Sequence, residues 1–124
     1  MDTNFKTKLE ELGADVDNTI LRFMGKEDLY LKFLNKFQND QSFANIEKYL
    51  AEENAEEAFK AAHTLKGVAA NLGLDPIAGC ASEITELLRH KEDFTDVDRG
   101  TLNSTKERLQ NNYHSLIDVL TSCQ

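Results

Sequence analysis

The sequence predicts an all-α fold, an up-down antiparallel four-helix bundle with short additional helices at its N-terminal end. Apolar side chains recur at three- and four-residue intervals along most of the chain, which is the period of an amphipathic helix. Only one proline and six glycines interrupt the 124 residues, so long helices are possible. We find no convincing strand pattern. The length suits one hydrophobic core, and we therefore expect residues 1–124 to form a single helical domain.

Two short helices are predicted first. The first ends at Gly13, because glycine is common just past a helix C-terminus. Asp15 or Asp17 can cap the second helix, which Gly25 ends. We expect the apolar residues of both helices to face the core, namely Phe5, Leu9, Leu12, Ile20, Leu21 and Phe23.

Residues 26–39 predict a longer helix, because apolar side chains recur there at i, i+4 and i+8. Aromatic residues at helical spacing usually belong to a core. We therefore expect Phe33 and Phe37 to be buried. Phe23 or Tyr30 could instead border a docking surface.

Three more helices are predicted between residues 42 and 90. Ser42 is the expected cap of the next helix. An amphipathic helix over residues 54–72 follows and ends at Gly73. Its apolar stripe, which we expect to be buried, consists of Ala55, Ala58, Phe59, Ala62, Leu65, Ala69 and Leu72. Asp75 can cap the third, with Pro76 at its first position. The short connection around Gly73 predicts that the two helices it joins pack as an antiparallel hairpin.

The last helix is expected to begin at Thr95 or Asp96, and Gly100 weakens its first turns. The sequence leaves open which earlier helix is the first member of the bundle. It is either the helix that begins near Lys26 or the one that begins near Ser42.

Composition and charge exclude several classes of function. A net charge of −8 argues against nucleic acid or an anionic membrane as the partner, since both attract basic surfaces. No apolar run is long enough to cross a bilayer, and no signal peptide is visible, so we expect a cytoplasmic monomer. Cys80 and Cys123 form no metal-binding or redox motif, and we expect free thiols.

His63 is the residue that calls for an explanation. It lies at the boundary between the apolar and polar faces of the helix over residues 54–72, with Lys66 and Gly67 one turn further along. A glycine in mid-helix costs about 1 kcal/mol relative to alanine. Either close helix packing or a need for open space beside the ring could account for Gly67. Lys66 favours the second explanation, because its ammonium could neutralise negative charge added to the imidazole.

Residues 63–67 read His-Thr-Leu-Lys-Gly, and residues 71–73 read Asn-Leu-Gly. Together they resemble the signature of histidine-containing phosphotransfer (HPt) domains of two-component phosphorelays. Residues 29–37 resemble the helix that precedes the site helix in that family, and Ile77, Ala81 and Ile84 fit the helix that follows it.

The resemblance implies a phosphorelay intermediate. His63 would accept a phosphoryl group from a receiver-domain aspartyl phosphate, or from a histidine kinase, and pass it to the receiver of another response regulator. Lys66 would supply a cation and Gly67 clearance. The implied partners are response-regulator receiver domains, a hybrid sensor histidine kinase, or both, with Mg²⁺ bound to the partner receiver.

The resemblance also implies a binding surface around the ring. Thr64, Ala70 and Asn71 would belong to it on the site helix. In many relatives a polar side chain of the following helix contacts the ring, and Thr85 occupies that position. Because Thr85 is shorter than the glutamine or glutamate often found there, a water or Glu86 could orient the ring instead.

The sequence contains no sign of a cofactor site. No glycine-rich phosphate loop and no kinase catalytic set is present, so no autonomous kinase activity is expected. The Glu-x-x-His pairs of a di-iron bundle are absent, because Lys60, Leu87 and Asn111 stand three residues before the histidines. We therefore expect no intrinsic cofactor and no metal.

Three other interpretations fit the same residues. His63 could be an ordinary boundary histidine of a helical bundle. The chain could be a helical adaptor that binds a receiver or a helical partner without phosphotransfer. It could also be a phosphotransfer module cut from a larger sensor kinase, whose local sequence would look the same.

Overall fold

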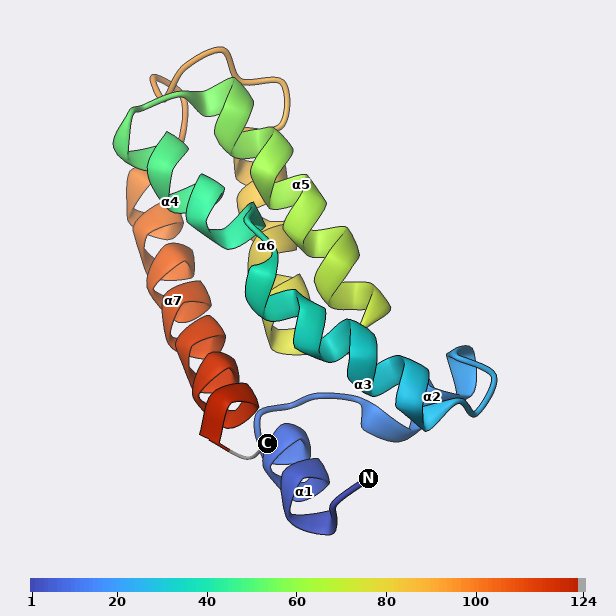
Figure 1. Ribbon diagram of the computed structural model, residues 1–124. Helices are drawn as coiled ribbons and strands as arrows, with labels where there is room; N and C mark the ends of the chain where they lie inside the picture. The colour runs from blue at the N-terminus through green and yellow to red at the C-terminus, as the bar shows by residue number, and fades with distance from the viewer. Residues whose placement is uncertain (123–124) are drawn as a thin grey trace.

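The computed structural model describes residues 1–122, and within them the chain is helical with no strand, which confirms the all-α prediction (Figure 1). The elements are α1 (Thr3–Glu11), α2 (Val16–Arg22), α3 (Glu27–Lys36), a 3-10 turn η1 (Phe37–Asn39), α4 (Ser42–Ala51), α5 (Ala55–Asn71), α6 (Asp75–Leu88) and α7 (Arg99–Ser122). No helix of the described residues is long and apolar enough to cross a membrane.

The most extensive contacts between helices join four helices that follow one another in the chain. α4 packs against α5, α5 against α6, and α6 against α7, and Figure 1 shows these helices running in alternate directions. α4, rather than α3, is therefore the earlier helix that lies along α5. The first three helices gather at one end, where α1 packs against α7 (Figure 1).

The core side of α5 consists mostly of small residues. Ala58, Ala62, Leu65 and Ala69 are fully buried, in agreement with the apolar stripe seen in the sequence. Small side chains allow α4 and α6 to approach α5 closely on its two flanks. The remaining face of α5 is left outside the bundle and is free to carry function.

The turn between α5 and α6 holds the N-terminal helices in place. The N–H of Asp15 donates to the carbonyl of Gly73 at 2.9 Å, and Arg22 Nη2 donates to the carbonyl of Ala70 at 3.1 Å. Gly73 has a φ of +69°, and a Cβ there would collide with Thr19 Oγ1 and lie 2.8 Å from the carbonyl oxygen of Asp15. The close approach of α2 to this turn therefore requires glycine.

Gly73→Ala is accordingly expected to lower the free energy of unfolding by about 2–4 kcal/mol, because a left-handed backbone and an overpacked contact add up. Urea unfolding followed by circular dichroism measures the loss. Gly79→Ala is the matched control, since Gly79 is helical and a Cβ there meets no atom within 4 Å. It should raise stability by about 1 kcal/mol. Equal effects of the two substitutions would contradict the packing described here.

Two side chains that we expected to be buried are exposed. Leu21 is 70% exposed, because α2 buries Val16 and Thr19 instead. Phe33 is 41% exposed, since α3 buries the neighbouring stripe of Tyr30, Leu34 and the following Phe37. The expected burial of Phe37 is confirmed, at 2% exposure. Tyr30 is fully buried and so cannot border a docking surface, whereas Phe23 is half-buried.

Some predicted helix starts were wrong by a few residues. Asp75 and Ser42 are the first residues of their helices and not the caps; the N–H of Ser42 instead donates to the Asp40 carboxylate at 2.8 Å. Asp15 stands at the cap position of α2, but its side chain accepts no capping hydrogen bond. Asn54 does cap α5, since its side chain accepts the N–H of Glu57 at 3.2 Å.

The start of α7 lies later than Thr95 or Asp96. The helix begins at Arg99, and the carboxylate of Asp98 accepts both the N–H of Thr101 at 3.0 Å and its hydroxyl at 2.8 Å. This pair of hydrogen bonds fixes the first turn, and it also holds the pKa of Asp98 below its ordinary value.

Candidate functional site

His63 stands halfway along α5 on the face that no other helix covers, and its side chain is exposed. Its ring is stacked with that of Phe59, one turn earlier, with 6.2 Å between the ring centroids and 9° between the planes. One face of the imidazole is thus sheltered by an aromatic neighbour, while the ring remains open to solvent. An exposed nitrogen held in a fixed direction is what a nucleophile on a rigid helix needs.

Gly67 leaves open space beside the ring. A Cβ at this position would meet no atom within 4 Å outside its own helix. Close helix packing therefore does not account for this glycine, and the alternative of free space one turn from His63 does. The gap leaves the α5 backbone accessible to a large partner.

A pair of charges on α6 lies beside this face of α5. The Glu86 carboxylate accepts hydrogen bonds from Arg89 Nη2 at 2.9 Å and from Arg89 Nε at 3.2 and 3.3 Å. The hydrogen bond from Arg89 lowers the pKa of Glu86, and the positive charge of Lys66 on α5 lowers it further. Glu86 and Arg89 therefore form an ion pair at the C-terminal end of α6, within electrostatic range of Lys66 on α5.

Arg89 also contacts the aromatic neighbour of the histidine. Its guanidinium lies 5.4 Å from the centroid of the Phe59 ring, the same ring that stacks with His63. Sequence reasoning did not single out Arg89. The i,i+3 spacing of Glu86 and Arg89 was a signal that they would pair on one helix face. Their position beside Phe59 depends on how α6 packs on α5, which local patterns do not specify.

Thr85 lies in the interior of the bundle. Thr85 is fully buried, and its hydroxyl donates to the carbonyl of Ala81 at 2.7 Å. It belongs to the core stripe of α6 with Ile84 and Leu88. A fully buried side chain is not part of an exposed surface, so the expectation that Thr85 belongs to the binding surface around His63 is wrong. Glu86, the next residue, is exposed.

The other predicted surface residues share the uncovered face of α5. Thr64, Ala70 and Asn71 are all exposed. The Thr64 hydroxyl donates to the carbonyl of Lys60 at 3.0 Å, so it is occupied within its own helix. Asn71 lies at the edge of an apolar groove beside α5.

The remaining histidines and the cysteine lie in different surroundings. His90 follows α6 with a φ of +61°, and the ring of His114 packs edge-on against Phe43 with 5.7 Å between centroids. Cys80 is buried with a free thiol, whose pKa is raised by that burial; Cys123 lies outside the described residues. Within residues 1–122, no three His, Cys, Asp or Glu side chains lie close enough together to hold a metal ion.

Comparison with known proteins gives one match. A family model described as Hpt domain matches residues 31–118, which is more than half of the chain and includes all of α5 and α6. A search of curated proteins and a search of solved structures found no match.

Proposed function

The chain belongs to the Hpt-domain family, and we propose that His63 is the residue that carries the phosphoryl group. The family's general role is histidine phosphotransfer in two-component phosphorelays, in contact with receiver domains and kinases. The observation that supports His63 is its exposed ring, stacked on Phe59 and next to the open space at Gly67.

The proposed chemistry is a single displacement at phosphorus. The unprotonated Nε2 of His63 attacks the phosphorus of an aspartyl phosphate in line with the leaving carboxylate. An N–P bond forms, the P–O bond to the carboxylate breaks, and the electron pair leaves with the carboxylate. Passing the group to a second receiver uses the same geometry in reverse.

The residues of this chain contribute positive charge and open space to this step. Lys66, three residues beyond His63 on α5, and Arg89, which contacts Phe59, would offset the negative charge of the phosphoryl group. Gly67 leaves room for the partner's active-site loops. Mg²⁺ bound to the receiver supplies further charge neutralisation. No intrinsic cofactor is required.

The rest of the chain presents the ring. We propose that α4, α5, α6 and α7 form the up-down four-helix bundle of a single domain covering residues 1–124, with α1 to α3 closing one end. Because α5 is packed between α4 and α6, the position of His63 on the surface of the bundle is fixed. The phosphoryl donor is a receiver or hybrid kinase and the acceptor is the receiver of a second regulator. The expected cytoplasmic location stays a prediction.

The test is a transfer assay. The purified chain is mixed with receiver domains phosphorylated on aspartate, and the label is followed by gel. We expect label to appear on the chain as the receiver loses it, and to be acid-labile and base-stable, as a phosphorus–nitrogen bond is. If the folded chain binds receivers but takes no label from any of them, the adaptor interpretation is correct instead.

Arg89→Ala is expected to slow transfer about three- to tenfold, because a solvent-exposed charge gives only modest stabilisation to a nearby phosphoryl group. Initial rates of labelling measure the effect, and Arg89→Lys should restore part of the rate. Arg99→Ala is the matched control, since Arg99 also pairs with a glutamate, Glu53 at 2.7 Å, and lies over an aromatic ring far from His63. Equal rates for Arg89→Ala and wild type would remove Arg89 from the site.

A further inference from the structure

We propose that Phe59 is a positioning residue for phosphotransfer, which orients the imidazole of His63 by ring stacking in place of a hydrogen bond. This inference rests on the proposed function and adds the group that orients the nucleophile. Within residues 1–122, the His63 ring forms no hydrogen bond with another residue, and it is stacked with the ring of Phe59. The orientation of the ring therefore depends on packing.

The stack follows from the spacing of the two residues. Phe59 and His63 are four positions apart on α5, so they lie on one face of the helix, one turn apart. Side chains of a helix lean toward its N-terminus, which brings the imidazole over the turn that carries Phe59. The distance of 6.2 Å between the centroids and the angle of 9° between the planes are typical of offset-stacked rings. A flat ring at this position limits rotation of the imidazole about its side-chain bonds.

The two flanks of the imidazole differ. Phe59 lies one turn before His63, whereas Gly67 lies one turn beyond it and has no side chain. A Cβ at Gly67 would meet no atom within 4 Å outside its own helix. One flank therefore supports the ring, and the other leaves room for the phosphoryl donor.

Phe59 is itself held in place by α6. Its side chain is half-buried and packs against the core, and the guanidinium of Arg89 lies 5.4 Å from the centroid of its ring. The carboxylate of Glu86 restricts Arg89 in turn, through the hydrogen bond of 2.9 Å from Nη2. Because contacts from two helices hold the Phe59 ring, that ring can orient the imidazole beside it.

The surroundings of His114 show that a histidine beside aromatic rings need not lie parallel to them. The ring of His114 makes an angle of 85° with that of Phe43 and of 75° with that of Tyr113. Edge-on neighbours of this kind leave the faces of the imidazole uncovered by a flat surface. The parallel arrangement with Phe59 therefore distinguishes His63 from His114.

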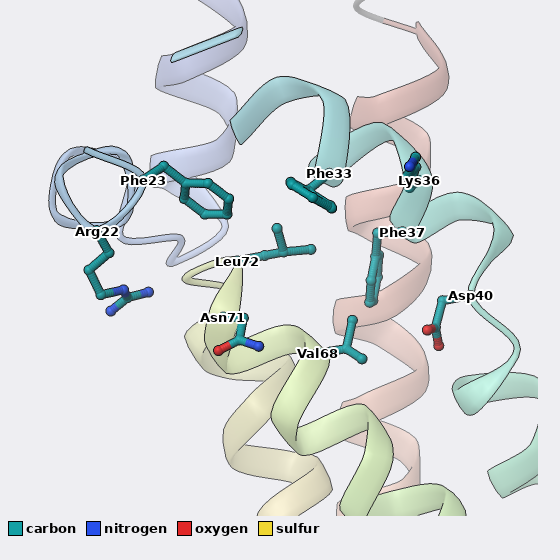
Figure 2. Close-up of a pocket in the computed structure, with 9 residues that line it drawn as sticks. All are labelled: Arg22, Phe23, Phe33, Lys36, Phe37, Asp40, Val68, Asn71 and Leu72. Atoms are coloured by element: carbon teal, nitrogen blue, oxygen red, sulfur yellow. The ribbon is translucent and has the colours of Figure 1, made fainter. Parts of the chain in front are cut away.

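Phe59 does not belong to the apolar groove beside α5. Figure 2 shows that α5 contributes Val68, Asn71 and Leu72 to this groove, and these residues follow His63 in the chain, whereas Phe59 precedes it. A substitution at Phe59 therefore leaves the groove unchanged. The affinity for a receiver and the rate of transfer within the complex can then be measured as separate quantities.

Phe59→Leu tests the inference, because leucine keeps an apolar side chain against the core but has no flat ring. Single-turnover transfer from a phosphorylated receiver is measured over a range of receiver concentrations, which separates Kd from the rate at saturation. We expect this rate to fall about tenfold, because the nucleophile is no longer held in its reactive orientation, and Kd to stay unchanged. Labelling by phosphoramidate, a small donor that needs no fixed orientation of the ring, should also stay unchanged.

Nuclear magnetic resonance measures the orientation itself. The three-bond couplings between Hα and the two Hβ protons of His63 report the populations of its side-chain rotamers. We expect one dominant rotamer in the wild-type chain and averaged couplings in Phe59→Leu. Phe59→Tyr keeps the ring and should retain both the rotamer and the rate of transfer.

Phe94→Leu is the matched control. The guanidinium of Arg99 lies 5.2 Å from the centroid of the Phe94 ring, so Phe94 repeats the contact between Arg89 and Phe59 without a stacked histidine. Phe94→Leu should transfer at the rate of the wild-type chain. A loss as large as that of Phe59→Leu would assign the effect to general destabilisation and overturn the inference.

Three further outcomes would overturn the inference while the proposed function stands. They are transfer by Phe59→Leu at the wild-type rate, a change in Kd with an unchanged rate at saturation, and His63 couplings that are the same in Phe59→Leu and the wild-type chain. No labelling of the wild-type chain by either donor overturns both proposals.

Discussion

His63→Gln is expected to abolish labelling of the chain by a phosphorylated receiver while changing the free energy of unfolding by less than about 0.5 kcal/mol. Glutamine fills a similar volume, but its amide nitrogen is not nucleophilic. The ring is exposed and is stacked with the ring of Phe59, so little stability depends on it. Loss of transfer would therefore reflect lost chemistry and not lost folding. Gel labelling and urea unfolding on the same preparation measure the two quantities.

The other two histidines provide the controls. His90→Asn keeps a residue that tolerates the φ of +61° at this position, and His114→Gln changes an exposed ring on α7. Both variants should accept label at the rate of wild type. Label that persists on His63→Gln and disappears from His90→Asn or His114→Gln would move the phosphoacceptor to a different helix.

The helical fold could be predicted because its main cause is local. On α5 the apolar spacing identified a stripe of seven residues, of which six are buried and Phe59 is only half-buried. The same spacing placed His63 at the edge of that stripe. Periodicity fixes the phase of a long helix well, because several positions must agree. The sequence allowed two explanations for Gly67, either close helix packing or open space beside the His63 ring. Only the positions of the neighbouring helices distinguish the two.

The errors share a physical cause. Phe33 and Leu21 are apolar residues on short helices, where two neighbouring stripes are nearly equal in hydrophobicity and the neighbours decide which is covered. Thr85 lies one residue from the exposed Glu86, and a shift of one residue rotates a helix position by about 100°. Arg89 was missed because its contact with Phe59 crosses from α6 to α5. Each of these errors concerns a tertiary contact, which cannot be predicted from the local pattern of a single sequence.

The position of Gly67 leads to the second large effect. Gly67→Gln is expected to slow transfer from a receiver by about a hundredfold or more, because displacing a partner by about 1 Å from its reactive geometry costs that much. The added side chain would fill the space that is now open one turn from His63. Folding should not suffer, since glutamine is favoured over glycine in a helix by several tenths of a kcal/mol. Labelling by phosphoramidate should persist, since a small donor needs little room.

Gly67→Ala distinguishes bulk from backbone effects. A Cβ at this position meets no atom within 4 Å, and α5 is helical there, so alanine should raise the free energy of unfolding by about 1 kcal/mol. It adds one methyl group and should keep most of the transfer rate. A stable Gly67→Gln protein that transfers as fast as Gly67→Ala would show that the partner does not approach over this residue. In that event Gly67 would lower the stability of α5 without serving phosphotransfer. The receiver would then have to reach His63 from the side of Lys66 and Arg89.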